Sequence, residues 1–237
     1  MSSETAPLFE RFAALSELPD CRHVFTRRIP GIDVSHDKAE ALRRLDAVHQ
    51  EIRESIGMGD WPLLTAEQVH GDKIEIVDLE VGSARCADRG HRSAVSLPSK
   101  EFAGRDGFIT NQRGLALGIY VADCCAVYIV DPITPVIGLV HSGKKGTELA
   151  IAAKAIEQMT ARFGCDPANM IVQLSPCIRP PHYEIDFASQ IVEQCRAQGV
   201  KQIHDSGICT ACHPDLYYSY RAEKGRTGRM LALLGLG

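Results

Sequence analysis

The sequence has little of what marks membrane, exported or nucleic-acid-binding proteins. Its formal net charge is −4, and no long run of one sign occurs, so it lacks the basic excess of a nucleic-acid binder. No apolar stretch reaches the roughly 18 residues that a membrane helix needs, so no membrane partner is expected. The first twenty residues contain acids and no basic segment followed by an apolar one. We therefore expect no signal peptide and a cytoplasmic location.

What is present fits a folded protein. Hydrophobic residues make up 45% and charged residues 24% of the 237 positions, which excludes disorder and allows a full core. Nine cysteines are an odd number, and without a signal peptide this favours reduced thiols over a disulfide framework. Neither a repeat nor a clear linker interrupts the chain. We predict a single domain over residues 1–237.

The apolar pattern predicts helices and strands in an irregular order, which favours an α+β fold over a regular βαβ array. The polar, weakly periodic segment 82–105 predicts a long surface excursion that could act as a lid. We expect helices over 37–56, 147–163 and 189–198, and strands over 64–69, 73–77, 106–110, 115–121, 126–130, 136–140 and 170–174.

Three residues of metal-ligand type stand at the ends of apolar segments: His70, Cys124 and His141. Two imidazoles and one thiolate form a ligand set of catalytic zinc sites, in which a fourth position stays open. Taken singly, each residue is more often a hydrogen-bonded histidine or a buried thiol. Two features favour a metal site. Each residue ends or interrupts a strand-like segment, and Gly71 and Gly143 follow two of them closely, so the backbone can turn there.

Longer motifs follow one another in an order that covers most of the chain: Thr26-Arg27, QVHG (68–71), DGFIT (106–110), ADCCAVYIVDP (122–132), IGLVHSGKKG (137–146), LSPCIRPPHYEI (174–185) and CTACHPDLYYSYRAEKGRTGR (209–229). Together they resemble the YfiH-like family, also called the polyphenol oxidase or laccase domain family.

The resemblance implies an α+β fold, a four-layer α/β/β/α sandwich with mixed β-sheets. It implies a zinc site on His70, Cys124 and His141. It also implies purine nucleoside and phosphate as partners, with phosphorolysis of adenosine, inosine, guanosine or methylthioadenosine and deamination of adenosine. Some bacterial members are similar proteins that remove wrongly incorporated amino acids from peptidoglycan precursors.

Two other cofactors are not expected. Multicopper chemistry needs many imidazoles, yet the chain has nine histidines and no His-x-His pair, so zinc is favoured over copper. Cys209-Thr210-Ala211-Cys212-His213 matches the pattern of covalent haem attachment, which usually needs an exported chain. The same segment with His204 is an alternative second metal site.

The chain departs from the family where the third ligand is followed by His-Ala-Gly-Trp-Arg-Gly. Here the segment is His141-Ser142-Gly143-Lys144-Lys145-Gly146, so Lys144 and Lys145 replace a tryptophan and an arginine. Arginine holds an oxyanion with a rigid fork, whereas lysine acts as a mobile point charge. Two lysines before a helix expected to start near Thr147 still suit an anion.

Roles for the remaining site residues follow as hypotheses. Asp123 and Gln68 join Cys124 as catalytic candidates, with Asp123 as a general base or as a carboxylate that orients a ligand histidine. Asp123 could instead cap a turn, and Gln68 could simply bind its loop. The tyrosines could stack on a purine or fill the core. The substrate-binding candidates are Arg27, Lys144, Lys145, Tyr183, Tyr220, Arg221 and Arg229.

Three functions compete at this point. The first is a zinc-dependent purine nucleoside enzyme. The second is an amidase-like hydrolase that edits peptidoglycan precursors, with the zinc ion or the Cys124 thiolate as its reactive group. The third is a non-catalytic nucleotide-binding relative in which Lys144 and Lys145 no longer support the chemistry. The sequence leaves open whether the protein is a monomer or a homodimer.

Overall fold

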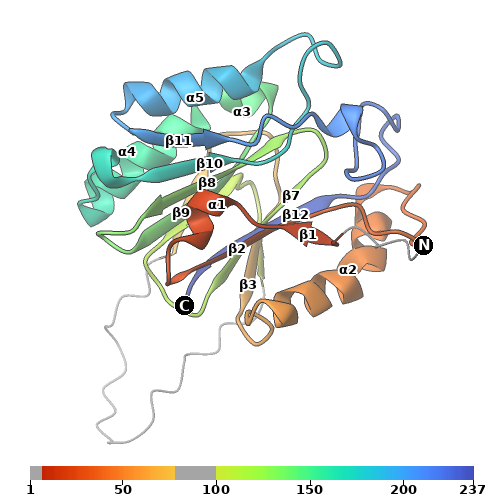
Figure 1. Cartoon of the computed structure of the whole chain (residues 1–237), viewed down its shortest axis with the longest axis horizontal. Helices are drawn as coiled ribbons and strands as arrows, with labels where there is room; N and C mark the ends of the chain where they lie inside the picture. Colours follow the sequence, from red (N-terminus) through yellow and green to blue (C-terminus); the bar gives the residue numbers. More distant parts are fainter. Residues whose placement is uncertain (1–6, 78–99) are drawn as a thin grey trace, which may run out of the picture.

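Two six-stranded mixed sheets face each other in the middle of the molecule, as the computed structural model of residues 7–77 and 100–237 shows (Figure 1). We call them sheet A, with strand order β1-β2-β12-β7-β3-β5, and sheet B, with strand order β11-β10-β8-β9-β6-β4. Helices cover the outer face of each sheet. This is the α+β, four-layer α/β/β/α arrangement that the resemblance implies, so that prediction is confirmed.

Sheet A contains the last described strand, β12, in its interior. β12 lies between β2 and β7 and is antiparallel to both, while β3 is parallel to β7 and to β5. The strands of sheet A are β1 (Phe9–Glu10), β2 (Cys21–Thr26), β3 (Leu63–Ala66), β5 (Lys100–Phe102), β7 (Ala116–Val121) and β12 (Met230–Leu236).

Sheet B is built around the hairpin of β8 and β9. The carboxylate of Asp131 accepts hydrogen bonds from the amides of Ile133 (2.9 Å) and Thr134 (3.0 Å), which fixes the turn between the two strands. The strands of sheet B are β4 (Ile74–Val77), β6 (Gly107–Thr110), β8 (Cys125–Asp131), β9 (Val136–Ser142), β10 (Ile171–Leu174) and β11 (Gln202–Asp205).

The helices form the outer layers. α2 packs on sheet A, and it begins where the Asp37 carboxylate accepts a hydrogen bond from the Glu40 amide. α4 and α5 pack on sheet B. The helices are α1 (Ala13–Ser16), α2 (Lys38–Ser55), α3 (Lys144–Glu148), α4 (Ile151–Phe163) and α5 (Phe187–Ala197), with 3₁₀ turns η1 (Pro167–Asn169) and η2 (Thr210–Cys212).

Strand β8 shows how the sequence divides the core. Its alternate residues Val127 and Ile129 pack under α4 and α5, whereas Ala126 and Tyr128 face sheet A. The hydroxyl of Tyr128 donates to the carbonyl of Val24 in β2 (2.8 Å), so a hydrogen bond joins the two sheets inside the core. A strand covered on both faces reads as a continuous apolar run, which is what the sequence shows here.

Most predicted elements are confirmed within a few residues, two predictions need correction, and a third lies largely outside the described residues. The helix expected over 147–163 is two helices, α3 and α4, because Ala150 adopts a left-handed backbone conformation (φ 56°) between them. The strand expected over 64–69 ends at Ala66, since Gln68 and His70 are also left-handed (φ 63° and 60°). Of segment 82–105, only 100–105 is described, and it begins with strand β5.

The sequence pattern missed β1, β2, β11 and β12. It placed His141 after a strand, but β9 runs to Ser142 and includes it. Within the described ranges, none of the helices combines the length and the apolar character that spanning a membrane requires.

Candidate functional site

The three predicted metal ligands meet at one end of the two sheets. His70 lies in the connection from β3 in sheet A to β4 in sheet B, and Cys124 lies between β7 in sheet A and β8 in sheet B. His141 is near the end of β9. One ligand atom from each lies within 4.8 Å of the others. Two of the three donors therefore come from places where the chain crosses between the sheets.

The three side chains differ in their exposure to solvent, and the group is accessible from the side of His70. The imidazole of His141 is buried, Cys124 is half-buried and His70 is exposed. Cys124 Sγ lies 3.8 Å from His70 Nε2, and the two imidazole rings meet edge to face with centroids 4.8 Å apart. Two imidazole nitrogens and a thiolate arranged around one point could hold a metal ion and leave a position free for a further ligand.

Asp106 fixes two of the three donors, and the sequence did not single it out. Its fully buried carboxylate accepts from His141 Nδ1 (2.9 Å), from the His70 amide (2.9 Å) and from the Gly71 amide (2.7 Å). With Nδ1 engaged, His141 presents Nε2 to the group, as metal-bound histidines do. Its position at the start of the DGFIT motif, just before β6, was the available signal.

Three non-glycine residues around the group have left-handed backbone conformations: Gln68 (φ 63°), His70 (φ 60°) and Asp123 (φ 83°). Such conformations are unfavourable for residues with a side chain and persist where the surroundings hold them. Gln68 is held by its amide, which donates to the Tyr120 carbonyl (2.6 Å) and accepts from the Tyr120 amide (2.9 Å). Backbone strain is thus concentrated in the two connections that carry His70 and Cys124.

The charges of the group stabilise one another. Burial raises the pKa of the Cys124 thiol, but the positive charge of His141 and hydrogen bonds from His141 and His70 outweigh it and bring the pKa down to about 6. Burial lowers the pKa of His141, while Cys124 and Asp106 raise it to about 9. A thiolate beside a charged imidazole is the protonation pattern that a cation replaces when it binds.

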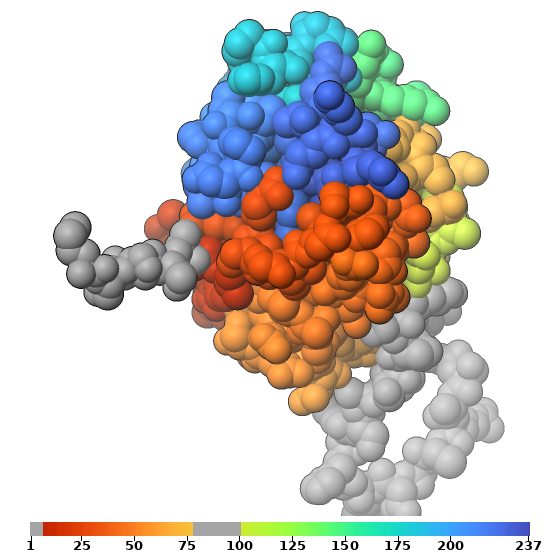
Figure 2. Space-filling model, turned by 90° about the vertical axis from the view of Figure 1, so that its right-hand side faces the viewer, coloured from red at the N-terminus to blue at the C-terminus, as the bar shows by residue number. Residues whose placement is uncertain are grey.

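A cavity of about 680 Å³ opens over the group, within the usual range for small-molecule sites. It brings together residues from both sheets, from α2, α3 and α5, and from residues 213–229 between η2 and β12, which we call the C-terminal loop. Figure 2 shows that the orange region, which includes α2, lies against the blue C-terminal segment. The lining residues are Lys38, Gln68, His70, Tyr120, Ala122, Asp123, Cys124, His141, Gly143, Lys144, Ile178, Tyr183, Phe187, Tyr220, Arg221, Lys224 and Arg229.

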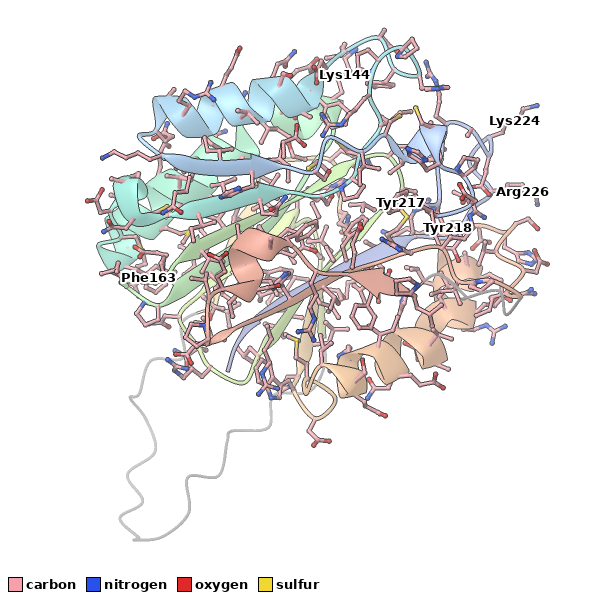
Figure 3. The ribbon with its side chains drawn as sticks, viewed as in Figure 1. Lys144, Phe163, Tyr217, Tyr218, Lys224 and Arg226 are labelled. Carbon is pink, nitrogen blue, oxygen red and sulfur yellow. The ribbon has the colours of Figure 1, made fainter. Side chains whose placement is uncertain are left out.

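The lining is strongly cationic. Among the described residues, five lysines and arginines line the cavity and Asp123 is the one carboxylate. Both of its oxygens are engaged, one by the hydroxyl of Thr210 (2.7 Å) and the other by the amide of Arg221 (2.7 Å). Figure 3 labels Lys144 at the start of α3 and Lys224 on the C-terminal loop. The cavity is therefore suited to an anion.

Aromatic rings supply the apolar surface of the cavity. Tyr183 and Phe187 meet edge to face with centroids 5.9 Å apart. The guanidinium of Arg221 lies 5.4 Å from the Tyr183 ring, and that of Arg229 lies 5.7 Å from the Tyr220 ring. Tyr220 is 55% exposed, so its ring is available to a flat ligand. Tyr217 and Tyr218 are instead buried in the core.

The structure separates the remaining sequence candidates. Lys144 lines the cavity, whereas Lys145 is exposed outside its lining. Arg27 also lies outside the lining and pairs with Glu10 (3.2 Å). Lys38 and Lys224 line the cavity and were missed, because nothing in a single sequence shows that the start of α2 and the C-terminal loop meet there.

The cysteine segment near the C-terminus stands apart from this group. Cys212 and His213 are exposed and Cys209 is buried, around the turn η2. In the part of the chain that the structure describes, His70, Cys124 and His141 form the one group of three or more residues able to hold a metal, so the alternative site with His204 is not supported.

The fold and the site define a class: two-sheet α+β proteins whose His/Cys/His group opens into a cationic cavity. The family model described as "Multi-copper polyphenol oxidoreductase laccase" matches residues 27–190 and 185–237, and the chain belongs to this family.

Curated relatives carry the name of an enzyme. The chain is 30% identical over 233 residues to "Purine nucleoside phosphorylase YlmD" of Geobacillus stearothermophilus, covering 81% of this chain and 79% of the relative. It is 27% identical over 204 residues to the protein of the same name from Bacillus subtilis, covering 72% and 69%.

Solved structures share the fold. The crystal structure of YlmD from Geobacillus stearothermophilus matches with a TM-score of 0.77 at 23% identity over 97% of this chain and 98% of that one. That of a hypothetical protein YfiH from Bacillus licheniformis matches with a TM-score of 0.75 at 22% identity over 92% and 93%.

Proposed function

We propose that this protein is a zinc-dependent purine nucleoside phosphorylase. The observation that carries the proposal is the cavity itself: it joins the His70, Cys124 and His141 group to a cationic and aromatic lining. Phosphate needs cations, a purine needs flat apolar surface, and both requirements are met within one space of about 680 Å³. The names of the curated relatives point to the same reaction class.

The donor set fits zinc. His70 Nε2, Cys124 Sγ and His141 Nε2 would hold the ion, and the Asp106 carboxylate would keep the His141 ring in place. When bound, zinc supplies a Lewis acid that polarises a substrate oxygen. A multicopper oxidase would need further ligand clusters, and the described residues contain a single group.

In phosphorolysis an oxygen of the hydrogen phosphate dianion forms a bond to C1′ of the ribose while the bond from C1′ to the purine nitrogen breaks. The purine leaves with the proton that the hydrogen phosphate gives up, and ribose 1-phosphate is the other product. The protein's residues would act mainly by position and charge. Lysine and arginine side chains of the cavity would hold the phosphate dianion. Tyr220 and Tyr183 would stack on the purine and keep the breaking bond in line with the phosphate.

Asp123 and Gln68 are positioning residues in this proposal rather than proton carriers. The Asp123 carboxylate binds Thr210 and the Arg221 amide, which ties the C-terminal loop to the turn that presents Cys124. The Gln68 amide binds the backbone of Tyr120 and holds the turn that presents His70. Neither side chain has a free acceptor directed at substrate among these contacts.

Adenosine deamination at the same site is the second activity that the family resemblance suggests. It requires a group that delivers protons to the purine ring and to the leaving ammonia. The one carboxylate among the described lining residues is already engaged at both oxygens, so the geometry favours phosphorolysis as the main reaction.

A hydrolase that edits peptidoglycan precursors is supported by one observation. In the metal-free protein Cys124 has a low pKa, about 6, and lies beside two histidines, as a thiolate nucleophile would. Metal coordination and nucleophilic attack compete for the same sulfur. Metal content together with turnover therefore distinguishes this function from the first.

The test is a product assay on metal-analysed protein. Adenosine, inosine, guanosine and methylthioadenosine are each incubated with and without phosphate, and products are separated by chromatography. Release of free base and ribose 1-phosphate that depends on phosphate supports the proposal. Inosine formed from adenosine without phosphate indicates deamination. Absence of turnover with one zinc per chain contradicts the proposal and favours the editing or nucleotide-binding function.

A further inference from the structure

Two cations on the wall of the cavity form no ion pair with an acidic side chain among the described residues. Lys38 is the first residue of α2, and Arg229 precedes β12. Both line the cavity, and neither forms an ion pair within residues 7–77 and 100–237. By contrast, Arg221, on the same lining, pairs with Glu184 at 3.2 Å.

These two side chains have hydrogen-bond donors to spare. The Lys38 ammonium donates once, to the Glu67 carbonyl (2.9 Å), and two of its three donors remain. Arg229 uses Nη1 for the carbonyls of Thr227 (2.8 Å) and Gly228 (2.9 Å), which leaves the donors on Nη2 and Nε. These contacts hold both side chains in place by their backbone surroundings, so the free donors are pre-positioned at the cavity wall.

Lys38 and Arg229 are half-buried cations on the lining of one cavity, a setting that favours an anionic ligand. Burial lowers the pKa of Lys38; Glu101 acts in the opposite direction, and the positive charge of Arg229 lowers it further. Burial also lowers the pKa of Arg229, while Tyr220 and the Cys124 thiolate raise it. Arg229 is therefore close enough to both Lys38 and Cys124 to feel their charges. Two half-buried positive charges repel one another, and an oxyanion bound between them would remove that repulsion.

We propose that Lys38 and Arg229 together bind the phosphate group of the substrate beside the His70, Cys124 and His141 group. The inference rests on the proposed function and names the residues that would hold its second substrate. The arginine fork contacts two oxygens of the tetrahedral anion, and the lysine supplies the second charge that a dianion needs.

The chemistry recognised is a phosphate group, which could arrive as inorganic phosphate or as the ester of a nucleoside monophosphate. We assign inorganic phosphate, because the pair lines the same cavity as His70, Cys124 and His141, where the reacting oxygen is needed. Lys144 and Lys224 also line the cavity, but they are more exposed than Lys38 and Arg229 and are not part of the pair.

The experiment measures binding rather than turnover. Isothermal titration of the zinc-loaded protein with inorganic phosphate, and separately with inosine 5′-monophosphate, is carried out on the wild type, Lys38→Met, Arg229→Gln and Lys38→Arg. Matched controls are Lys201→Met and Arg196→Gln, which are exposed and outside the cavity. Zinc content and the thermal unfolding midpoint of each variant show whether it has folded with its metal site intact.

We expect the phosphate Kd to rise about tenfold or more in Lys38→Met and Arg229→Gln, to change less than about threefold in Lys38→Arg, and to stay unchanged in both controls. Wild-type affinity in Lys38→Met and Arg229→Gln would overturn the inference. So would binding of the monophosphate alone, which would make the ester the ligand. If phosphate binds through the pair and no nucleoside is cleaved, the proposed function fails and this inference stands.

Discussion

At the scale of single residues, the carboxylate behind the ligands is as important as the ligands. Asp106 is fully buried and accepts three hydrogen bonds, one from the His141 ring and two from the chain that carries His70. Removing its charge leaves two backbone amides and one imidazole with a weaker partner. The position of His70 and the orientation of His141 both depend on this residue.

The variant Asp106→Asn tests that dependence. We expect its zinc affinity to fall about 10- to 100-fold, the usual effect of losing a carboxylate that orients a ligand histidine. Competition with a chromophoric chelator measures the affinity. Asp215→Asn, a change at an exposed aspartate, is the matched control. Unchanged zinc affinity in Asp106→Asn with a folded protein would show that the ligands hold their positions without it.

The pKa of Cys124 gives a prediction on pH. The metal-free thiol has a pKa of about 6, lowered from 9.0, so in the folded protein it becomes a thiolate as pH rises through about 6. Cys212 is more exposed, but its pKa is raised, chiefly by its hydrogen bond with Cys209. Iodoacetamide at pH 7 should therefore label Cys124 faster than Cys212, and the Cys124 rate should fall below pH 6. Peptide mass analysis measures both rates, and the opposite order would contradict the assigned charges.

At the scale of elements, the turn after β9 packs closely against the turn before β8, with Gly143 next to the thiol of Cys124. A Cβ added at Gly143 would lie 2.5 Å from Cys124 Sγ, far below van der Waals contact. The backbone of Gly143 (φ −104°) is open to other residues, so the conflict is with the sulfur alone. Glycine is thus needed here for close approach rather than for conformation.

Gly143→Ala should therefore displace Cys124 and weaken zinc binding by about tenfold or more, with little loss of fold. Gly138→Ala, in the preceding strand β9, is the control, because its Cβ would meet neighbours only at 3.4–3.6 Å. Zinc stoichiometry after dialysis measures the effect. Full zinc retention in Gly143→Ala would show that the thiol can move without losing the metal.

The break between α3 and α4 is a second test at this scale. Ala150 is left-handed (φ 56°), which is unfavourable for alanine by about 1–2 kcal/mol and neutral for glycine. Ala150→Gly should raise the free energy of unfolding by about 1 kcal/mol, while Ala153→Gly inside α4 should lower it by about 1 kcal/mol. Urea unfolding measures both. A loss of stability in Ala150→Gly would mean that Ala150 makes packing contacts that outweigh its strain.

Some elements could be predicted from the sequence because their signals are local. The helix α2 has its cap, Asp37, and its apolar period within one segment, and β8 and β9 are apolar runs joined by a turn at Asp131-Pro132. The break at Ala150 has no such signal, since alanine is the best helix former. The final strand β12 is apolar throughout, but only its pairing with β2 and β7 shows that it is a strand and not a helix.

The grouping of His70, Cys124 and His141 could be predicted from residue type and context, and the structure brings the three side chains together. The cavity wall could not: Lys38 and Arg229 are far apart in sequence, and their proximity depends on how α2 and the C-terminal loop pack. Asp123 lines the cavity, but its contacts with Thr210 and the Arg221 amide become visible only in three dimensions.

At the scale of the whole molecule, a bound metal would link the two sheets. Two donors sit on the crossings from sheet A to sheet B, and the third belongs to sheet B. An ion held by all three therefore binds the folded state and not the unfolded chain. Its removal should lower stability by RT ln(1 + [L]/Kd), about 2.7 kcal/mol when the free metal is at 100 times its Kd.

Chelation should thus lower the unfolding midpoint by about 5–10 °C in a protein of this size. Differential scanning calorimetry with and without a strong chelator measures the shift. Cys124→Ala is the control, since its midpoint should respond little to chelator once one donor is lost. Equal shifts in both proteins would mean that the metal binds elsewhere.

The position of β12 has a consequence for how the protein is made. Sheet A has β12 in its interior, between β2 and β7, yet Met230–Leu236 emerges from the ribosome after every other described element. Until then β2 and β7 each present an unpaired edge, and the hydroxyl of Tyr128 can find Val24 only once sheet A is in place. Sheet B can therefore form on the nascent chain, because all its strands have been synthesised by Asp205. Sheet A can be completed only after β12 has been synthesised. Until then the unpaired edges of β2 and β7 are prone to aggregation, and chaperones would protect them.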